Sequence, residues 1–294
     1  MNVSVIETAL EKLRRTGAAP AGLPDRALIR PPARAVTAPE PAPPSTRVMP
    51  IDLARLRAIG YVPDVAEERR FADYYREIKR PLIHQAMDPH AAADRRWLIV
   101  SSALPGEGKT FTTLNLALSM AREQDISVLL LDGDLPRASL SRTLGVQDEP
   151  GLLQALLDPA VDAESLVLRT DVSGLSLLPA GGATDSAAEL LGSERMLEVA
   201  ARLLARDPRR IVLLDCSPLL ASTEARALLR IPSLVILVVR AGQTPQQALL
   251  DTLALMDRKK VHGLVLNDAY TRRGEGYYGY SGYGASRAQV DAPG

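Results

Sequence analysis

Residues 101–110, Ser-Ser-Ala-Leu-Pro-Gly-Glu-Gly-Lys-Thr, form a glycine-containing turn between two apolar runs. The run before the turn, Trp97–Val100, has the length and composition of a buried strand, and residues 111–118 after it favour a helix. In a strand–turn–helix unit of this kind, backbone N–H groups of the turn and of the helix N-terminus converge on one point and bind phosphate. The sequence therefore predicts a phosphate-binding loop.

This loop matches the P-loop NTPase pattern G-x-x-x-x-G-K-[ST] except at its first position, where Ala103 replaces glycine. In that motif the lysine, here Lys109, reaches the β- and γ-phosphates, and the hydroxyl of Thr110 binds Mg²⁺. ATP and Mg²⁺ are the expected cofactors, and the alternative is a glycine turn that binds nothing. The residues expected at the nucleotide are Pro105, Gly106, Glu107, Gly108, Lys109, Thr110 and Phe111.

Composition narrows the class of protein. The 294 residues allow one or two domains, and 35 Lys and Arg balance 35 Asp and Glu, so no net charge favours nucleic acid. Cys216 is the single cysteine, which excludes an intrachain disulfide and suits a reducing cytosol. No apolar run approaches the roughly 20 residues of a membrane span, and no signal peptide is recognisable. We therefore expect a cytoplasmic protein that reaches the membrane through a partner.

Five segments are expected from the patterning of the chain. They are an amphipathic helix at 1–16, a Pro/Ala-rich disordered linker at 17–47, a helical lead-in at 48–94, an α/β domain at 95–268 and a disordered Tyr/Gly-rich tail at 269–294. The first helix has a narrow apolar stripe, which would either pack on the domain or dock on a partner. In the lead-in, a helix over 67–85 is expected to kink or end at Pro81.

Strands and helices alternate from Arg95 to Asp268, which predicts a three-layer α/β domain with a mainly parallel sheet. Parallel strands covered on both faces are continuous apolar runs, as here. The predicted strands are 98–101, 128–131, 175–178, 211–214, 234–239 and 261–266, and the predicted helices are 110–122, 152–157, 196–205 and 246–256.

Carboxylates follow two of these strands. Asp132 and Asp134 come after one strand, and Asp215 ends another in the Walker B arrangement. The carboxyl ends of parallel strands form the edge where ligands bind, and an Asp in this position holds the Mg²⁺ shell. The alternative for each residue is an aspartate that caps a loop.

These features together resemble the bacterial tyrosine kinases (BY-kinases), the autokinases of capsular and exopolysaccharide export. The resemblance rests on the P-loop, on Asp132-x-Asp134 followed by Arg137, on Asp215 followed by Pro218, and on a C-terminal tyrosine cluster. It covers most of the chain from Met1 to Tyr283 except the linker. The order of residues from Ile51 to Ile83, together with the N-terminal helix before it, is most similar to the subgroup that accompanies exosortase-linked polysaccharide clusters.

The resemblance implies catalytic roles for Lys109, Asp132, Asp134 and Arg137, and an Mg²⁺ shell of Thr110, Asp134 and Asp215. Asp132 would be the base or orienting group for the incoming phenol, whose pKa near 10 makes it a poor nucleophile at neutral pH. Arg137 would hold phosphate or acceptor, and Asn267 at the end of the last strand would contact adenine.

The sequence departs from the family pattern at two places, one after Asp215 and one in the predicted helix over 67–85. Ser217 occupies a position where the family often has proline, and we expect this difference to have a mild effect. Glu77 and Arg80 match the start of a motif linked to ring assembly, but Ile83 occupies its third position, which leaves the ring geometry open. The alternative for Glu77 and Arg80 is a solvated helix face.

Five of the eight tyrosines follow Asn267 and are the expected phosphoacceptors: Tyr270, Tyr277, Tyr278, Tyr280 and Tyr283. A glycine-rich tail lets each phenol visit an active site at high local concentration. The alternative is an inert low-complexity tail.

The expected function is therefore autophosphorylation on tail tyrosines, in regulation of exopolysaccharide synthesis. By resemblance, the partners are an inner-membrane chain-length-determining co-polymerase as activator, further copies of the chain in a possible ring, and a cognate tyrosine phosphatase. One alternative is a positioning or partitioning ATPase, although such ATPases carry a lysine where Leu104 stands here. A second alternative is a nucleotide-binding scaffold of the polysaccharide machinery.

Overall fold

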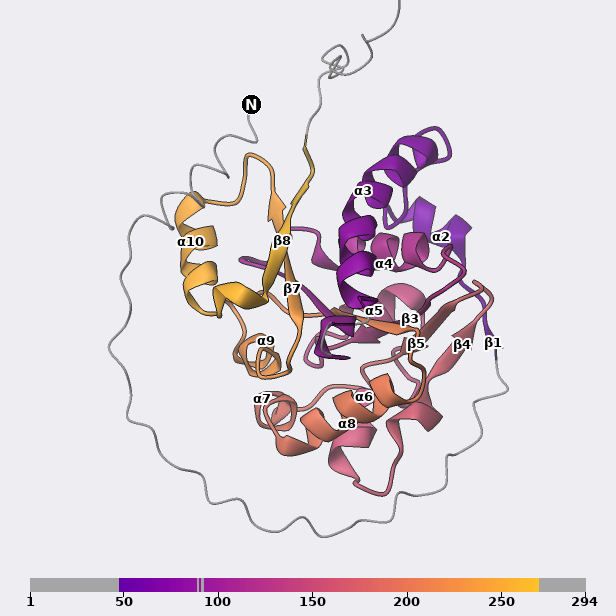
Figure 1. Ribbon diagram of the computed structural model, residues 1–294, viewed down its shortest axis with the longest axis vertical. Helices are drawn as coiled ribbons and strands as arrows, with labels where there is room; N and C mark the ends of the chain where they lie inside the picture. The colour runs from indigo at the N-terminus through magenta and orange to yellow at the C-terminus, as the bar shows by residue number, and fades with distance from the viewer. Residues whose placement is uncertain (1–47, 89, 91–92, 270–294) are drawn as a thin grey trace, which may run out of the picture. The chain divides into compact units, whose positions relative to one another are not determined.

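The computed structural model describes residues 48–88, 90 and 93–269 (Figure 1). The predicted N-terminal helix, the linker and the five tail tyrosines lie outside these residues. Within the described part of the chain, no helix combines the length and the apolar character that crossing a membrane requires.

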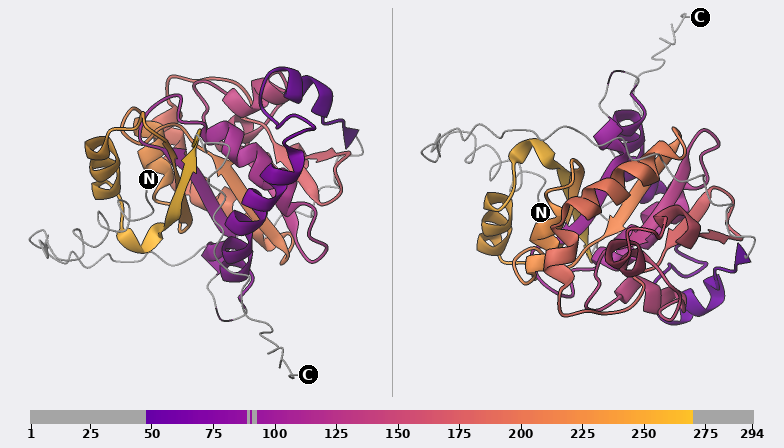
Figure 2. Two further views of the ribbon diagram at one scale, coloured as in Figure 1. Left: turned by 90° about the horizontal axis from the view of Figure 1, so that it is seen from above. Right: turned by 90° about the horizontal axis from the view of Figure 1, so that it is seen from below.

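An eight-stranded sheet forms the centre of the described chain, with helices on both of its faces (Figures 1 and 2). Its strand order is β1-β4-β5-β3-β6-β2-β7-β8, and every pair is parallel except β4 with β5. The strands are β1 (Val48–Met49), β2 (Trp97–Ser102), β3 (Ser127–Asp132), β4 (Leu168–Thr170), β5 (Leu175–Leu178), β6 (Arg210–Asp215), β7 (Leu234–Arg240) and β8 (Val261–Asn267).

All six predicted strands are present, each with ends within one residue of the prediction, so the three-layer α/β fold is confirmed. The sequence analysis missed β1 and β4, because two or three residues carry no periodic pattern. It also missed three short helices, α5 (Ser139–Leu144), α7 (Ala187–Leu191) and α9 (Thr223–Leu228). The predicted helices appear as α4 (Lys109–Met120), α6 (Leu152–Leu157), α8 (Glu194–Ala205) and α10 (Gln246–Ala254).

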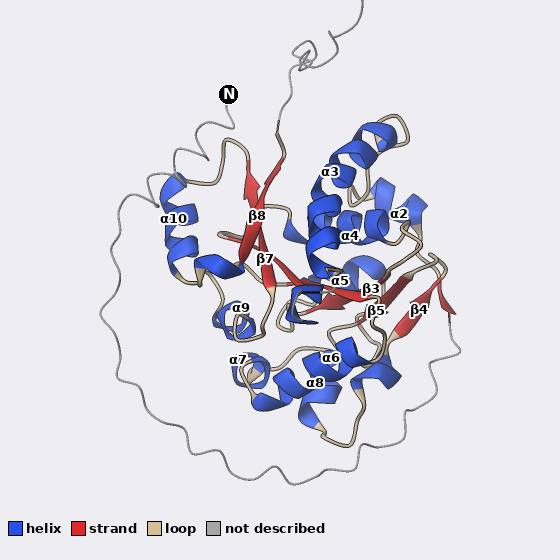
Figure 3. Ribbon diagram, in the orientation of Figure 1, coloured by secondary structure: helices blue, strands red, loops and turns tan. Residues whose placement is uncertain are grey.

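Helices α3 (Glu68–Ala86) and α4 cover one face of the sheet, while α6 and α8 cover the other (Figure 3). Alternate residues of the central strands, such as Leu98, Val128 and Leu213, pack with Leu114 of α4 in one buried apolar core. The same core includes Leu56 of the short helix α2 (Leu53–Ala58). The lead-in therefore shares a core with the sheet, and the boundary placed at residue 94 stays a prediction.

Helix α3 continues past Pro81 to Ala86, so the early end considered for this helix does not occur. Proline removes one backbone donor, but tertiary packing offsets that loss. Tyr75 and Leu82 are buried against the core, and the buried Lys79 donates from Nζ to the carbonyl of Ser119 at 2.7 Å. Lys79 also pairs with Glu123 at 2.8 Å, which ties α3 to the end of α4.

Candidate active site

The phosphate-binding loop joins β2 to α4, as predicted, and two of its glycines have backbone conformations that favour glycine. Gly106 has φ 81°, and Gly108, directly before α4, has φ 91°. A Cβ atom on Gly108 would lie 1.9 Å from Nδ2 of Asn267. Gly108 is therefore required both by its left-handed conformation and by the close approach of Asn267.

Glu107 holds this loop in place from inside the protein. Its side chain is buried, and Oε2 accepts a hydrogen bond from the backbone N–H of Leu104 at 2.8 Å. Oε1 accepts from the hydroxyl of Thr244, and its carbonyl oxygen accepts from Nδ2 of Asn267 at 3.0 Å. The Glu107 side chain thus bonds within the protein, while the exposed Pro105 and Gly106 form the outer turn of the loop.

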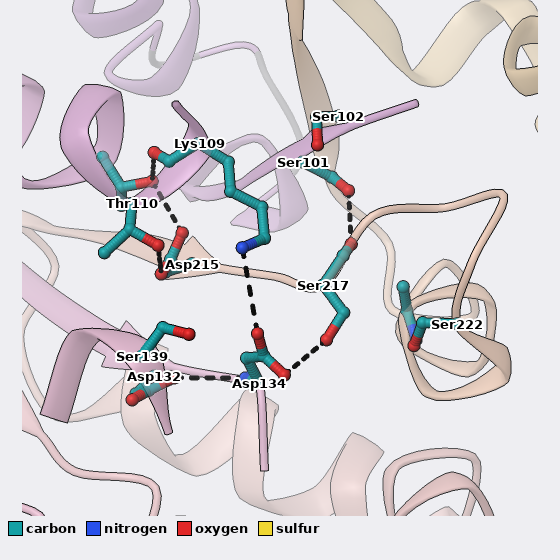
Figure 4. Close-up of polar contacts among 12 residues, drawn as sticks. Ser101, Ser102, Lys109, Thr110, Asp132, Asp134, Ser139, Asp215, Ser217 and Ser222 are labelled. Carbon is teal, nitrogen blue, oxygen red and sulfur yellow. Dashed lines mark hydrogen bonds and ion pairs between the residues drawn. The ribbon is translucent and has the colours of Figure 1, made fainter. Parts of the chain in front are cut away.

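Three aspartates meet behind the loop at the carboxyl ends of β3 and β6 (Figure 4). Asp132 and Asp215 are register partners across the two parallel strands. Asp134 follows two residues after Asp132, and all three side chains are almost completely buried. The structure therefore brings the three predicted carboxylates together with Lys109 and Thr110.

Asp215 is bound to helix α4. Its Oδ2 accepts a hydrogen bond from the Thr110 hydroxyl at 2.7 Å, and Oδ1 accepts from the Thr113 hydroxyl at 3.2 Å. Burial raises the pKa of Asp215 to about 7, while the nearby charge of Lys109 opposes this rise. A cation at this position would stabilise the ionised carboxylate.

Asp134 faces Lys109 and has one oxygen without a hydrogen bond. Its Oδ1 accepts from the hydroxyl of Ser217 at 2.6 Å, and its Oδ2 lies 3.8 Å from Nζ of Lys109. That Oδ2 is buried without a hydrogen-bond partner among the described residues. A buried carboxylate oxygen without a hydrogen bond is stabilised by a bound water or cation, which fits the predicted Mg²⁺ site.

The donor set also fits magnesium by its chemistry. Among the residues that the structure describes, no group of three or more His, Cys, Asp or Glu side chains could hold a metal ion by itself. Mg²⁺ in nucleotide sites takes one or two carboxylates, a hydroxyl, waters and phosphate oxygens. Thr110, Asp134 and Asp215 are the residues that could hold it.

Asp132 is enclosed by its own loop. Its Oδ2 accepts hydrogen bonds from the backbone N–H of Ser141 at 2.8 Å and from the Ser141 hydroxyl at 2.7 Å. Its Oδ1 accepts from the backbone N–H of Asp134 at 3.1 Å. Burial raises the pKa of Asp132 to about 6, although the bonds from Ser141 oppose the rise.

The remaining predicted site residues lie around this cluster. Arg137 is exposed on the loop after Asp134, and no hydrogen bond or ion pair joins its guanidinium to the cluster within the described chain. Phe111 packs edge-on against Phe71 of α3, with ring centroids 6.2 Å apart. Asn267 lies against Gly108 at the end of β8.

A cleft of about 1170 Å³ opens beside the loop, between α3 and the end of β8. Gly106, Phe111 and Asn267 line it on the side of the loop, and Phe71 and Tyr74 line it on the side of α3. The cleft therefore adjoins the phosphate-binding loop and presents aromatic rings to it.

Sequence reasoning missed Thr113 and Ser141, and it noted Ser217 as a departure from the family pattern without giving it a role in the cluster. Thr113 lies three residues after Thr110, which places both hydroxyls on one helix face, and this spacing could have been noticed. Ser217 lies two residues after Asp215, as Asp134 lies two after Asp132. Because Asp132 and Asp215 are in register, these second residues also meet, but the register is not evident from the sequence.

Comparisons with known proteins identify relatives of this chain. Residues 97–262 match the family model of an AAA domain. The chain is 30% identical over 195 residues to the tyrosine-protein kinase YwqD of Bacillus subtilis, covering 64% of this chain and 81% of that relative. It is also 30% identical over 191 residues to the tyrosine-protein kinase ptk of Acinetobacter johnsonii, covering 64% of this chain and 25% of ptk. The chain thus spans about a quarter of the length of ptk.

The solved kinase domain of the Escherichia coli tyrosine kinase ETK has the same fold, with a TM-score of 0.57 and 25% identity. The match covers 70% of this chain and 80% of that domain. The narrower assignment to the exosortase-linked subgroup stays a prediction. The AAA-domain match and the extended similarity to YwqD show that this chain belongs to the bacterial tyrosine kinase family.

Proposed function

We propose that the protein is an ATP-dependent tyrosine kinase that transfers the γ-phosphoryl group of ATP to tyrosines of its own C-terminal segment. One observation carries the proposal: the phosphate-binding loop and the strand-end carboxylates form a single polar cluster. Nζ of Lys109 lies 3.8 Å from Asp134, and the Thr110 hydroxyl donates to Asp215 at 2.7 Å.

In the proposed reaction the loop N–H groups hold the phosphates, and Lys109 neutralises charge that develops between the β- and γ-phosphates. Thr110, Asp134 and Asp215 would hold Mg²⁺. The bound ion supplies Lewis-acid stabilisation of the phosphate oxygens. Oδ2 of Asp134 supports this role, because it is buried without a hydrogen bond and lies only within ion-pair distance of Lys109.

Asp132 is the proposed base for the acceptor. The phenolic oxygen of tyrosine would attack the γ-phosphorus, the bond from phosphorus to the β–γ bridging oxygen would break, ADP would leave, and the phenolic proton would pass to Asp132. A pKa of about 6 suits a carboxylate that must be ionised near neutral pH and still accept a proton. Asp132 accepts three hydrogen bonds, one on Oδ1 and two on Oδ2, which leaves one lone-pair site of Oδ1 for the phenol.

Arg137 and Asn267 have proposed binding roles. Arg137 is exposed next to the cluster, so its guanidinium is free to meet the acceptor or a phosphate. Asn267 lines the cleft beside the loop, where a base attached to bound phosphates would lie. The aromatic rings of Phe71 and Phe111 support a planar ligand there.

The proposed partners follow from the family: a membrane co-polymerase as activator, further copies of the chain, and a tyrosine phosphatase. Glu77 and Arg80 are exposed on α3 and therefore available for assembly. Ile83, at the third position of that motif, packs against the core. An assembly through α3 would therefore rely on two charged side chains of this motif.

The test is a phosphosite map of the full chain after incubation with ATP and Mg²⁺, and of the same chain isolated from cells that contain its partners. Phosphate should appear on Tyr270 to Tyr283, and Lys109→Met should abolish labelling while Lys259→Met, an exposed lysine control, should not. ATP hydrolysis without phosphotyrosine would instead identify a positioning ATPase. ATP binding with neither activity would identify a scaffold.

A further inference from the structure

The last described residues, Asn267–Ala269, are tied to the phosphate-binding loop, and we call them the tail root. The carbonyl of Asn267 accepts a hydrogen bond from the backbone N–H of Ala241 at 2.9 Å, which secures the end of β8 to β7. Its side-chain amide donates to the carbonyl of Glu107 at 3.0 Å. The segment that carries the predicted acceptor tyrosines therefore begins at a point fixed against the loop.

Arg240, the last residue of β7, makes a second link between the same two segments. Its Nε and Nη2 each lie 2.9 Å from Oδ2 of Asp268. Its Nη1 donates to the carbonyl of Gly106 at 3.5 Å. One planar guanidinium thus bridges a carboxylate of the tail root and the outer turn of the phosphate-binding loop.

Asp268 has the left-handed backbone conformation, with φ 56°. Asp and Asn tolerate this conformation better than other residues with a side chain, but it remains less favourable than an extended one. The ion pair with Arg240 holds the residue where the chain changes direction. Together the two links hold the tail root against the end of β7 and the phosphate-binding loop.

The tail root also forms part of the wall of the cleft. Asn267, Asp268 and Ala269 line it together with Arg240 and Gly106. Tyr270, the first predicted acceptor, is only two residues from Asp268. The last described residues before the predicted acceptors therefore line the cleft that adjoins the proposed nucleotide site.

We propose that Arg240 is a positioning residue, which with Asp268 anchors the acceptor segment beside the phosphate-binding loop. This inference rests on the proposed kinase function. A tethered acceptor reacts at a rate set by its effective concentration, which depends on where the tether is anchored. The pair itself is largely exposed, with 37% and 56% of the two side chains accessible, so it contributes little to folding stability.

Asp268→Asn is the sharpest test, because asparagine keeps the size and the left-handed tolerance but loses the charge. We expect it to lower the initial rate of tail phosphorylation by about two- to fivefold, the change that loss of an exposed ion pair produces. The rate on an added glutamate–tyrosine copolymer, which is not joined to the tail root, should fall less than the tail rate, so the ratio of the two rates should drop. Arg240→Gln also removes the bond to the Gly106 carbonyl, so it should lower the ratio of tail rate to copolymer rate at least as far. Adding Asp268→Asn to Arg240→Gln should give no further loss, because the ion pair is already absent.

Arg230→Gln is the matched control, since Arg230 forms an exposed ion pair with Glu194 at 2.9 Å and lies before the start of β7, at the opposite end of that strand from Arg240. It should leave both rates unchanged. An equal fall on tail and copolymer in Asp268→Asn, or no fall on the tail, would overturn the positioning role. A wild type that labels the copolymer but not the tail would overturn it too. Labelling of neither substrate would instead overturn the proposed function.

Discussion

Strands β3 and β6 each end in an aspartate, and the two aspartates are neighbours in the sheet yet have different hydrogen-bond partners. Asp132 and Asp215 are in register and have no exposed surface. Asp215 accepts hydrogen bonds from two hydroxyls of α4, so it belongs to the phosphate-binding unit. Asp132 accepts from Ser141 and from the backbone of Asp134, so it belongs to its own loop.

The two aspartates differ in whether a hydrogen-bond donor can be replaced by a cation. A threonine hydroxyl rotates and can turn a lone pair toward a cation, whereas a backbone N–H can only donate. Asp215 can therefore share its site with Mg²⁺ while Thr110 becomes a second ligand. Asp132 keeps two backbone donors, which hold its carboxylate in place and suit a residue that handles a proton. Equal burial thus allows two different chemical roles.

The largest expected effect tests whether Asp132 acts as a base or only anchors its loop. Asp132→Asn should lower kcat on the glutamate–tyrosine copolymer at least about 100-fold, because an amide cannot take the phenolic proton. Ser141→Ala removes one hydroxyl donor but leaves its backbone N–H, and should cost less than about tenfold. Steady-state kinetics and melting temperatures of both variants provide the measurement.

The pH profile of kcat distinguishes loss of the base from a folding defect of the variant. In the wild type kcat should fall as the pH drops below about 6, where Asp132 becomes protonated. The Asp132→Asn variant should lack this limb. Equal losses in Asp132→Asn and Ser141→Ala, with unchanged pH profiles, would show that Asp132 serves only to anchor its loop.

A second prediction concerns the stability of the nucleotide-free protein against pH. The folded state holds protons on Asp215 and Asp132 up to pH values of about 7 and 6, whereas the unfolded state releases them near 3.8. The folded state binds more protons in this window, so these groups make the free energy of unfolding fall as pH rises from about 4 to 7.

Asp215→Asn should remove part of this pH dependence and stabilise the nucleotide-free protein at pH 8 by on the order of 2 kcal/mol. Urea denaturation at pH 5 and pH 8 measures the difference from wild type. Asp251→Asn, an exposed carboxylate on α10, serves as the control. If wild type and Asp215→Asn showed the same pH dependence, the buried charge of Asp215 would not be the cause.

The smallest effect tests backbone strain in the loop after β3. Ala138 has φ 45°, and it is one of two non-glycine residues with positive φ in the described chain, whereas the loop after β6 has none. Ala138→Gly should raise the free energy of unfolding by up to about 1 kcal/mol. Ala201→Gly, in the exposed middle of α8, should lower it by about 1 kcal/mol, as measured by chemical denaturation. A loss of stability in Ala138→Gly would show that the loop is not strained there.

Much of the site could be predicted because its residues follow local patterns. Lys109 and Thr110 lie in a loop whose composition is distinctive, and Asp134 and Asp215 follow long apolar strands. Helix α3 past Pro81 could not be predicted in the same way. Its continuation depends on the burial of Tyr75, Lys79 and Leu82 against distant parts of the chain.

The amino-acid order by itself determined the phosphate-binding loop, the alternation of strands with helices and the set of acidic strand ends, because each is a property of a few neighbouring residues. Only the tertiary structure decided that Ser217 binds Asp134, that Thr113 binds Asp215 and that Arg240 links Asp268 to Gly106. These contacts join residues far apart in the chain. They depend on strand order and register, which the packing of the whole sheet selects.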